Sequence, residues 1–327
     1  MQAYTRRSRR PFMKITGNHH VTAITSSAEK NYHFFTRILG MRLVKKTVNQ
    51  DDIQTYHMFY ADEAGTAGTD VTFFDFPNIQ KGIHGTDEIE RIGMRVRSNQ
   101  AIDYWESRFN ELNISFDRFT IFNQEALYFE DEDGQRYALY SDEGLNLDPI
   151  GVPWKKSPVP AEFQILGLGP MTLTVSEPEK MDHVLTHHLG YKKIQEEGKR
   201  SLYEIAPSGN GARVIVKHLE GSRGLQGYGT VHHTAFKIKD KDTLDAWANY
   251  FTSIKVPHSG YVDRFYFKSL YTRLYRPILF ELATEGPGFI DDEESYDTLG
   301  EDLALPPKLR PMKEEIKKMV RPIDTSR

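Results

Sequence analysis

The chain has 327 residues, of which 39% are hydrophobic and 27% charged, and a net charge of −4. This composition is typical of a soluble globular protein of one or two domains, and it excludes a largely disordered chain and a strong positive field that would recruit nucleic acid. No apolar run approaches the roughly 18 residues of a membrane-spanning helix, and the absence of cysteine excludes disulfides, thiolate metal sites and cysteine nucleophiles. We therefore expect a cytoplasmic protein that works with oxygen and nitrogen groups and has no nucleic-acid or membrane partner.

The first 13 residues form a basic arm. The stretch SRRPFMK at 8–14 is similar to a twin-arginine export signal, but the apolar segment that such a signal requires does not follow it. We expect residues 1–13 to be a disordered, solvated arm.

From residue 14 onward, the sequence predicts one order of elements four times: a strand, a helix and three strands. The helices carry apolar residues at helical spacing, as at Tyr32, Phe35 and Leu39, and the strands are rich in Val, Thr, Tyr and Phe. Gly40 is expected to end the first helix. In the first two units we expect strands at 16–25, 41–49, 54–60, 69–76 and 90–98, helices at 27–39 and 100–112, and further strands up to 141. In the third unit we expect a strand at 168–176, a helix at 178–189 and further strands up to 219. In the fourth unit we expect a strand at 231–239, a helix at 241–254 and strands at 262–268, 270–275 and 277–284.

Internal sequence similarity supports these units. EKNYHFFTRILG at 29–40 matches EKMDHVLTHHLG at 179–190, and IDYW at 102–105 matches LDAW at 244–247. Repeats of this kind indicate one supersecondary unit used several times. The predicted fold class is therefore α+β, with four βαβββ modules.

These modules are expected to form two tandem domains, 14–146 and 163–290. Residues 147–162 are proline-rich and are expected to form the linker between them. Residues 291–327 leave the pattern, and a basic stretch at 313–321 in this tail is a candidate helix. We expect the tail to pack on the body or on a partner chain, which leaves a homo-oligomer open.

Three polar residues break the internal symmetry of the repeats. His20, His233 and Glu281 lie on predicted strands where the sister module carries an unrelated residue. Their counterparts at the two repeat offsets are Pro170, Arg91 and Leu139. A carboxylate within an apolar strand is costly to bury without a counter-charge. Two imidazoles and one carboxylate are the ligand set typical of non-haem Fe(II). The pattern predicts a metal site of these three residues, with Mn(II) as an alternative and a purely structural role for the histidines also open.

Both histidines belong to pairs, His19-His20 and His232-His233. Neighbours on a strand point to opposite faces, so one member of each pair is expected to face the metal directly and the other to serve elsewhere or reach round from an edge. Alternation also places Thr22 on the same face as His20.

Four segments carry a resemblance to a known family: GNHHVTAI at 17–24, YHMFYADEAGTAGTDVTFF at 56–74, GTVHHTAF at 229–236 and DRFYFKSLYTRLYRPILFE at 263–281. Together they resemble the vicinal oxygen chelate superfamily of glyoxalases, extradiol dioxygenases and bleomycin-resistance proteins. The sequence is most similar to the ring-cleaving dioxygenases that act on hydroquinones.

The resemblance implies two glyoxalase-like domains and Fe(II) bound by His20, His233 and Glu281. It also implies a surrounding catalytic set. In this set His232 is the acid–base group, Tyr271 hydrogen-bonds the metal-bound oxygen and Arg264 stabilises negative charge, and the remaining members are His19 and Thr22. The implied partners are O2 and a small aromatic substrate, a hydroquinone or a catechol-like ring. Two other functions remain open: a glyoxalase-like metal-dependent lyase or isomerase, and a non-enzymatic ligand-sequestering protein.

Overall fold

The structure is a computed structural model that describes residues 13–145, 151–205, 209–291 and 293–327. All but the last residue of the expected N-terminal arm, 1–13, lies outside these described residues. The first part of the expected linker, 147–150, lies outside them too.

Four βαβββ modules follow one another along the chain, as the sequence predicts. The first module comprises β1 (Ile15–Ile24), α1 (Ala28–His33), the π-helical turn η2 (Phe34–Ile38), β2 (Arg42–Asn49), β3 (Asp52–Ala61) and β4 (Asp70–Asp75). The second comprises β5 (Glu88–Val96), α2 (Asn99–Glu111), β6 (Phe116–Ile121), β7 (Gln124–Glu130) and β8 (Arg136–Ser141). The third comprises β9 (Gly167–Leu168), β10 (Met171–Val175), α3 (Pro178–His183), η4 (Val184–Leu189), β11 (Lys192–Glu197), β12 (Arg200–Glu204) and β13 (Arg213–His218). The fourth comprises β14 (Thr230–Ile238), α4 (Lys241–Ser253), β15 (Val262–Asp263), β16 (Lys268–Thr272) and β17 (Phe280–Thr284).

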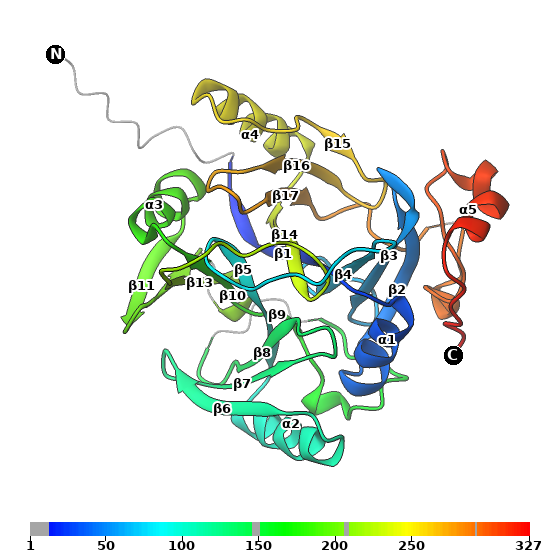
Figure 1. Ribbon diagram of the computed structural model, residues 1–327, viewed down its shortest axis with the longest axis horizontal. Helices are drawn as coiled ribbons and strands as arrows, with labels where there is room; N and C mark the ends of the chain where they lie inside the picture. The colour runs from blue at the N-terminus through cyan, green and yellow to red at the C-terminus, as the bar shows by residue number, and fades with distance from the viewer. Residues whose placement is uncertain (1–12, 146–150, 206–208, 292) are drawn as a thin grey trace.

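The modules combine into two curled sheets (Figure 1), and each sheet takes one module from each half of the sequence. The eight-stranded sheet has the order β15-β16-β17-β14-β1-β4-β3-β2 and so joins the first module to the fourth. The nine-stranded sheet has the path β11-β12-β13-β10-β5-β8-β7-β6, with β9 paired to β5, and joins the second module to the third. The first strands of paired modules meet antiparallel at the centre, β1 with β14 and β10 with β5.

The helices begin and end at residues suited to those positions. Ser27, Ser98 and Asp240 cap α1, α2 and α4 by accepting a hydrogen bond from a backbone N–H of the first turn. Gly40 follows the first helix with a positive φ of 69°, as expected of a glycine that ends a helix. The apolar face of α2, including Trp105 and Phe109, is fully buried, so the helices cover the sheets and leave the opposite sheet faces for other contacts.

The C-terminal tail packs on β2, the edge strand of the eight-stranded sheet (Figure 1). The Ala304 N–H donates to the Lys46 carbonyl, and the buried Lys45 Nζ lies 2.5 Å from Glu294 Oε2. The tail therefore covers backbone groups that an edge strand would otherwise expose. Its basic stretch contains the helix α5 (Lys313–Met319), as predicted. Short 3-10 turns lie at Ala161–Phe163, Asn210–Ala212, Tyr296–Thr298 and Arg310–Met312.

The hairpin before β17 differs from the expected pattern. Instead of a strand over 262–268, β15 has two residues, and the chain then turns. Phe265 has a positive φ of 70°, and the Arg264 N–H donates to the Phe267 carbonyl. The turn, and not a strand, sets the position of the Arg264 side chain.

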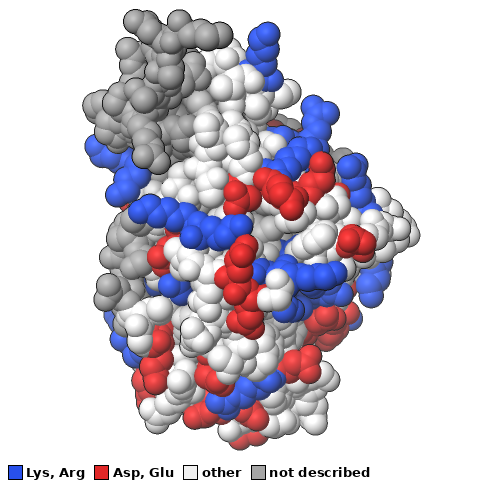
Figure 2. Space-filling view, turned by 90° about the vertical axis from the view of Figure 1, so that its left-hand side faces the viewer, with Lys and Arg blue, Asp and Glu red and all other residues white. Residues whose placement is uncertain are grey.

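The surface is mixed in charge. Figure 2 shows Lys and Arg interspersed with Asp and Glu over the face it presents. Among the described residues, no helix is both long and apolar enough to cross a membrane.

Candidate metal centre

The three residues that break the repeat symmetry lie on adjacent strands in the middle of the eight-stranded sheet. His20 is on β1, His233 on β14 and Glu281 on β17. Thr22 pairs with His233 and Ala235 with Glu281, so alternation directs all three side chains to the same face of the sheet. All three are buried.

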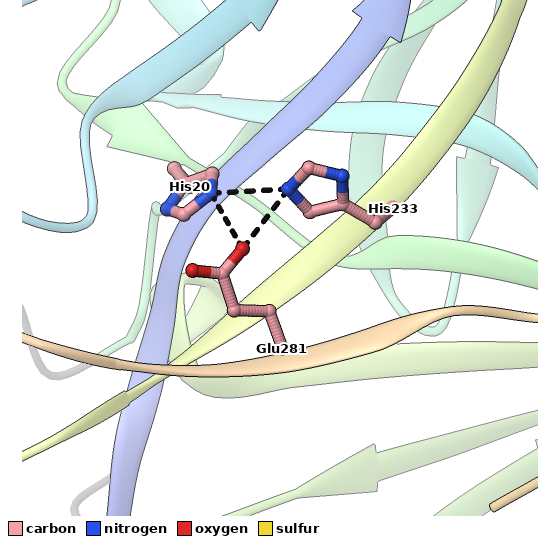
Figure 3. A group of neighbouring side chains, drawn as sticks. All are labelled: His20, His233 and Glu281. Carbon is pink, nitrogen blue, oxygen red and sulfur yellow. Dashed lines mark hydrogen bonds and ion pairs between the residues drawn. The ribbon is translucent and has the colours of Figure 1, made fainter. Parts of the chain in front are cut away.

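Their ligand atoms converge on one point (Figure 3). His20 Nε2 and His233 Nε2 are 3.3 Å apart and lie 3.2 and 3.0 Å from Glu281 Oε2. Ser269 Oγ donates a 2.5 Å hydrogen bond to Glu281 Oε1, which orients the carboxylate, whereas the buried Oε2 has no hydrogen-bond partner of acceptable geometry. Among the described residues, this is the group of histidine and acidic side chains that could hold a metal ion. An orphaned carboxylate oxygen facing two imidazole nitrogens fits a divalent transition metal.

The protonation states also suit a metal. Burial alone would raise the pKa of Glu281, but His20 and His233 hold it well below its ordinary value, so the side chain is a carboxylate. Burial lowers the pKa of His233. Metal binding requires deprotonated ligands, and this environment favours an anionic carboxylate and a neutral imidazole at the site.

The other histidine of each pair is the extra residue of a β-bulge. The pairing of β1 with β14 shifts between Asn18 and His20, which leaves His19 unpaired, and shifts again on β14, which leaves His232 unpaired. A bulge turns a side chain away from strict alternation. Both histidines of a pair can therefore approach the site, where simple alternation would send them to opposite faces.

These bulge histidines hydrogen-bond the proposed ligands. His19 Nδ1 lies 2.9 Å from His20 Nδ1, and His232 Nδ1 lies 2.8 Å from His233 Nδ1. His19 Nε2 lies 2.9 Å from the Thr284 carbonyl, which can only accept, so Nε2 carries the proton of this ring. Burial, followed by the charge of His20, lowers the pKa of His19 to about 3, so the ring is neutral. Its bare Nδ1 must then accept from His20 Nδ1–H, which leaves the lone pair of His20 on Nε2.

The remaining predicted residues lie around the triad. Thr22 Oγ1 is 3.1 Å from His233 Nε2, on the face that alternation predicts. The Tyr271 ring meets the His233 ring edge to face, with centroids 5.8 Å apart. Arg264 Nε donates to the Tyr271 hydroxyl at 3.1 Å, and Arg264 Nη2 pairs with the exposed Asp51 at 2.9 Å. Arg264 therefore joins the site to the β2–β3 turn.

A cavity of about 280 Å³ opens on His20 and His233 of the triad. Its walls are largely aromatic, and Arg264, Tyr271 and His232 supply polar groups. The cavity also contains residues that the sequence did not single out. They are His57 and Phe59 from β3, Phe74 from β4, Tyr266, Phe267 and Leu279 from the fourth module, and residues 47–51. Residues 56–60, YHMFY, alternate between two faces of a strand, with His57 and Phe59 on one face and core residues on the other. The local sequence does not identify which of the two faces lines the cavity.

Comparisons with known proteins show the family to which the chain belongs. The family model of the glyoxalase/bleomycin resistance protein/dioxygenase superfamily matches residues 17–139. A Bacillus subtilis (strain 168) protein named ring-cleaving dioxygenase MhqA is 42% identical over 318 residues, which cover 95% of this chain and 100% of that protein. The chain belongs to this superfamily. The predicted family, fold class and enzyme class are confirmed.

One further relative and two solved structures are similar to this chain. The chlorohydroquinone/hydroquinone 1,2-dioxygenase of Sphingobium indicum is 29% identical over 320 residues, covering 93% of this chain and 95% of that protein. A solved structure described as a dioxygenase from Bacillus subtilis strain 168 superposes with a TM-score of 0.88 at 31% identity, covering 96% of this chain and 99% of that chain. Glyoxalase I from Zea mays has a TM-score of 0.57 at 12% identity, covering 82% of this chain and 91% of that chain, and shows the shared fold alone.

The second sheet of this superfamily member is an internal control for the site. Thr172 pairs with Arg91 on β10 and β5 as Thr22 pairs with His233, which confirms that Arg91 is the counterpart of His233. Tyr128 pairs with Ala138 as Tyr271 pairs with Glu281, so the counterpart of Glu281 is Ala138. The expected counterpart, Leu139, is wrong by one residue because the segment between α4 and β16 is one residue longer than the matching segment of the second module.

Side chains fill the region of the second sheet that corresponds to the metal centre. The Arg91 guanidinium lies 3.8 Å from the centroid of the Tyr128 ring, and Ala138 belongs to an apolar cluster with Tyr140. The converging donors are therefore a property of the first and fourth modules, and not of the βαβββ scaffold.

Proposed function

We propose that the protein is a non-haem Fe(II)-dependent, extradiol-type ring-cleaving dioxygenase that inserts O2 into the ring of a hydroquinone or a catechol-like aromatic. The observation that carries the proposal is the approach of His20 Nε2 and His233 Nε2 to the orphaned Glu281 Oε2. The names of the relatives, one of which is a chlorohydroquinone/hydroquinone 1,2-dioxygenase, support the substrate class.

His20, His233 and Glu281 would hold the ion, and three protein ligands leave positions for substrate and O2. Bound Fe(II) would supply a Lewis acid that lowers the pKa of a substrate hydroxyl and a one-electron path to O2. Mn(II) accepts the same nitrogen and oxygen donors, so the two metals are distinguished by experiment.

The other residues move protons and stabilise charge. Burial, followed by the charge of His233, lowers the pKa of His232 to about 3, so this ring enters the reaction neutral and able to accept a proton as charge develops beside it. Burial, followed by Glu281, raises the pKa of Tyr271, which keeps the phenol protonated as a hydrogen-bond donor. Arg264 orients this phenol and supplies a positive charge that favours an anionic transition state. The aromatic walls exclude water.

The test is anaerobic reconstitution with Fe(II), Mn(II) or Zn(II), followed by O2 uptake against a panel of hydroquinones and catechols. The proposal predicts O2 consumption with opening of the ring, greatest with Fe(II). Conversion of a substrate without O2 by the Zn(II) form would instead identify a glyoxalase-like lyase or isomerase. Equal ligand binding by the metal-free protein, without turnover, would identify a sequestering protein.

A further inference from the structure

His57 lines the cavity but takes no part in the proposed metal site. It lies on β3 and is half-buried, with Phe59 two residues later on the same face of the strand. Its ring packs against Phe59 and Phe74, with centroids 3.9 and 4.4 Å apart, so its orientation is fixed by aromatic contacts. The described residues of β3 and β4 that line the cavity are His57, Phe59 and Phe74, so His57 is the polar group of this wall.

The two nitrogens of His57 have different surroundings. Nε2 lies 2.9 Å from Thr72 Oγ1, and Thr72 Oγ1 lies 2.8 Å from Thr22 Oγ1 beside His233. Nδ1 has no hydrogen-bond partner among the described side chains and backbone groups, and it is not one of the fully enclosed unpaired atoms, so solvent reaches it. Thr72 thus anchors one edge of the imidazole and leaves the other free for a ligand in the cavity.

A substrate with two para hydroxyls needs such a group. One hydroxyl would lie at the metal ligands, and the ring would lie between the aromatic walls. The second hydroxyl would then be buried on the far side of the ring, where an unpaired polar group is costly. A ring with adjacent hydroxyls would place both near the metal ligands and have nothing to offer this wall.

We infer that His57 is a specificity-determining residue that hydrogen-bonds, through Nδ1, the substrate hydroxyl remote from the metal ligands, and so selects 1,4-dihydroxy rings. The inference rests on the proposed function in taking an aromatic diol as the substrate. It adds a role for a side chain outside the triad and its neighbours.

The test compares binding of hydroquinone with binding of 4-methylphenol, in which a methyl group replaces the second hydroxyl. Both are titrated calorimetrically into the Fe(II)-loaded protein without O2, so binding is read apart from turnover. The wild type should bind hydroquinone roughly tenfold more tightly, the effect of one hydrogen bond to a buried group. His57→Phe should lose this preference by weakening hydroquinone alone, and should raise the KM for hydroquinone more than it lowers kcat.

Two amide variants form a matched pair. His57→Asn places a polar atom near the position of Nδ1 and should keep most of the preference, whereas His57→Gln places one near Nε2 and should lose it. Equal weakening of both ligands by His57→Phe, a preference that survives in it, or no preference in the wild type would overturn the assignment. If the preference depends on His57 but the wild type consumes no O2, the proposed function fails and the assignment stands. If the wild type consumes O2 and His57→Phe keeps the preference for hydroquinone over 4-methylphenol, the proposed function stands and the assignment of His57 fails.

Discussion

The Nδ1 atoms of His19 and His20 lie 2.9 Å apart, so these chain neighbours are hydrogen-bonded to each other at the candidate metal centre. The contact is possible because His19 is the extra residue of a β-bulge. The Thr284 carbonyl fixes the proton of His19 on Nε2, and His19 in turn fixes the proton of His20 on Nδ1. Through these two hydrogen bonds, the fold leaves the lone pair of His20 on Nε2, the atom that we propose as the metal ligand.

His19→Gln tests this relay. A glutamine amide can still reach the Thr284 carbonyl but offers no acceptor at the position of Nδ1, so His20 loses its orienting partner. We expect Fe(II) affinity to fall roughly 10–100-fold, the usual effect of removing a group that orients a metal-bound histidine. Competition with a coloured chelator measures this. His33→Gln, at an exposed histidine of α1, is the control, and equal affinities in the two variants would contradict the relay.

His232→Ala separates metal binding from turnover. The variant should still bind iron to full occupancy at saturating Fe(II), because His20, His233 and Glu281 remain. Its kcat should fall by roughly 10²–10⁴, the usual contribution of a general acid–base group. Iron content and kcat are measured on the same sample. Failure to fill with iron would mean that His232, and not His233, is the ligand.

The sequence predicted the triad because the repeats supply an internal comparison. His233 and Arg91 occupy matching strand positions, and this difference in residue type is what singled out His233. The four modules were likewise predictable from periodicity. The pairing of the first module with the fourth was not, because the repeat pattern is the same whichever modules share a sheet. His57 and Ser269 were missed because their roles depend on contacts with Thr72 and Glu281, which are distant in sequence.

The metal-free protein should lose stability as the pH falls. Burial, as the largest cause, lowers the pKa of His19 and of His232 from 6.5 to about 3. Between these values the unfolded chain binds protons that the folded protein does not, so the free energy of unfolding decreases as pH falls from about 6.5 towards 3. Each histidine contributes up to about 1.4 kcal/mol per pH unit in that window. Urea unfolding at pH values from about 7 to about 5 measures the slope. His19→Gln should make it shallower, and an unchanged slope would contradict a neutral, buried His19.

The most direct test of the metal centre is the iron content and O2 uptake of Glu281→Ala and His233→Ala after anaerobic reconstitution. Each substitution removes one of the three converging donors, and Glu281→Ala removes the anionic one, whose Oε2 lies 3.2 and 3.0 Å from the two imidazoles. We predict that the wild type and His33→Gln bind iron and consume O2 with a hydroquinone, and that both triad variants lose iron and O2 uptake together. A triad variant that retained full iron and full activity would contradict the assignment.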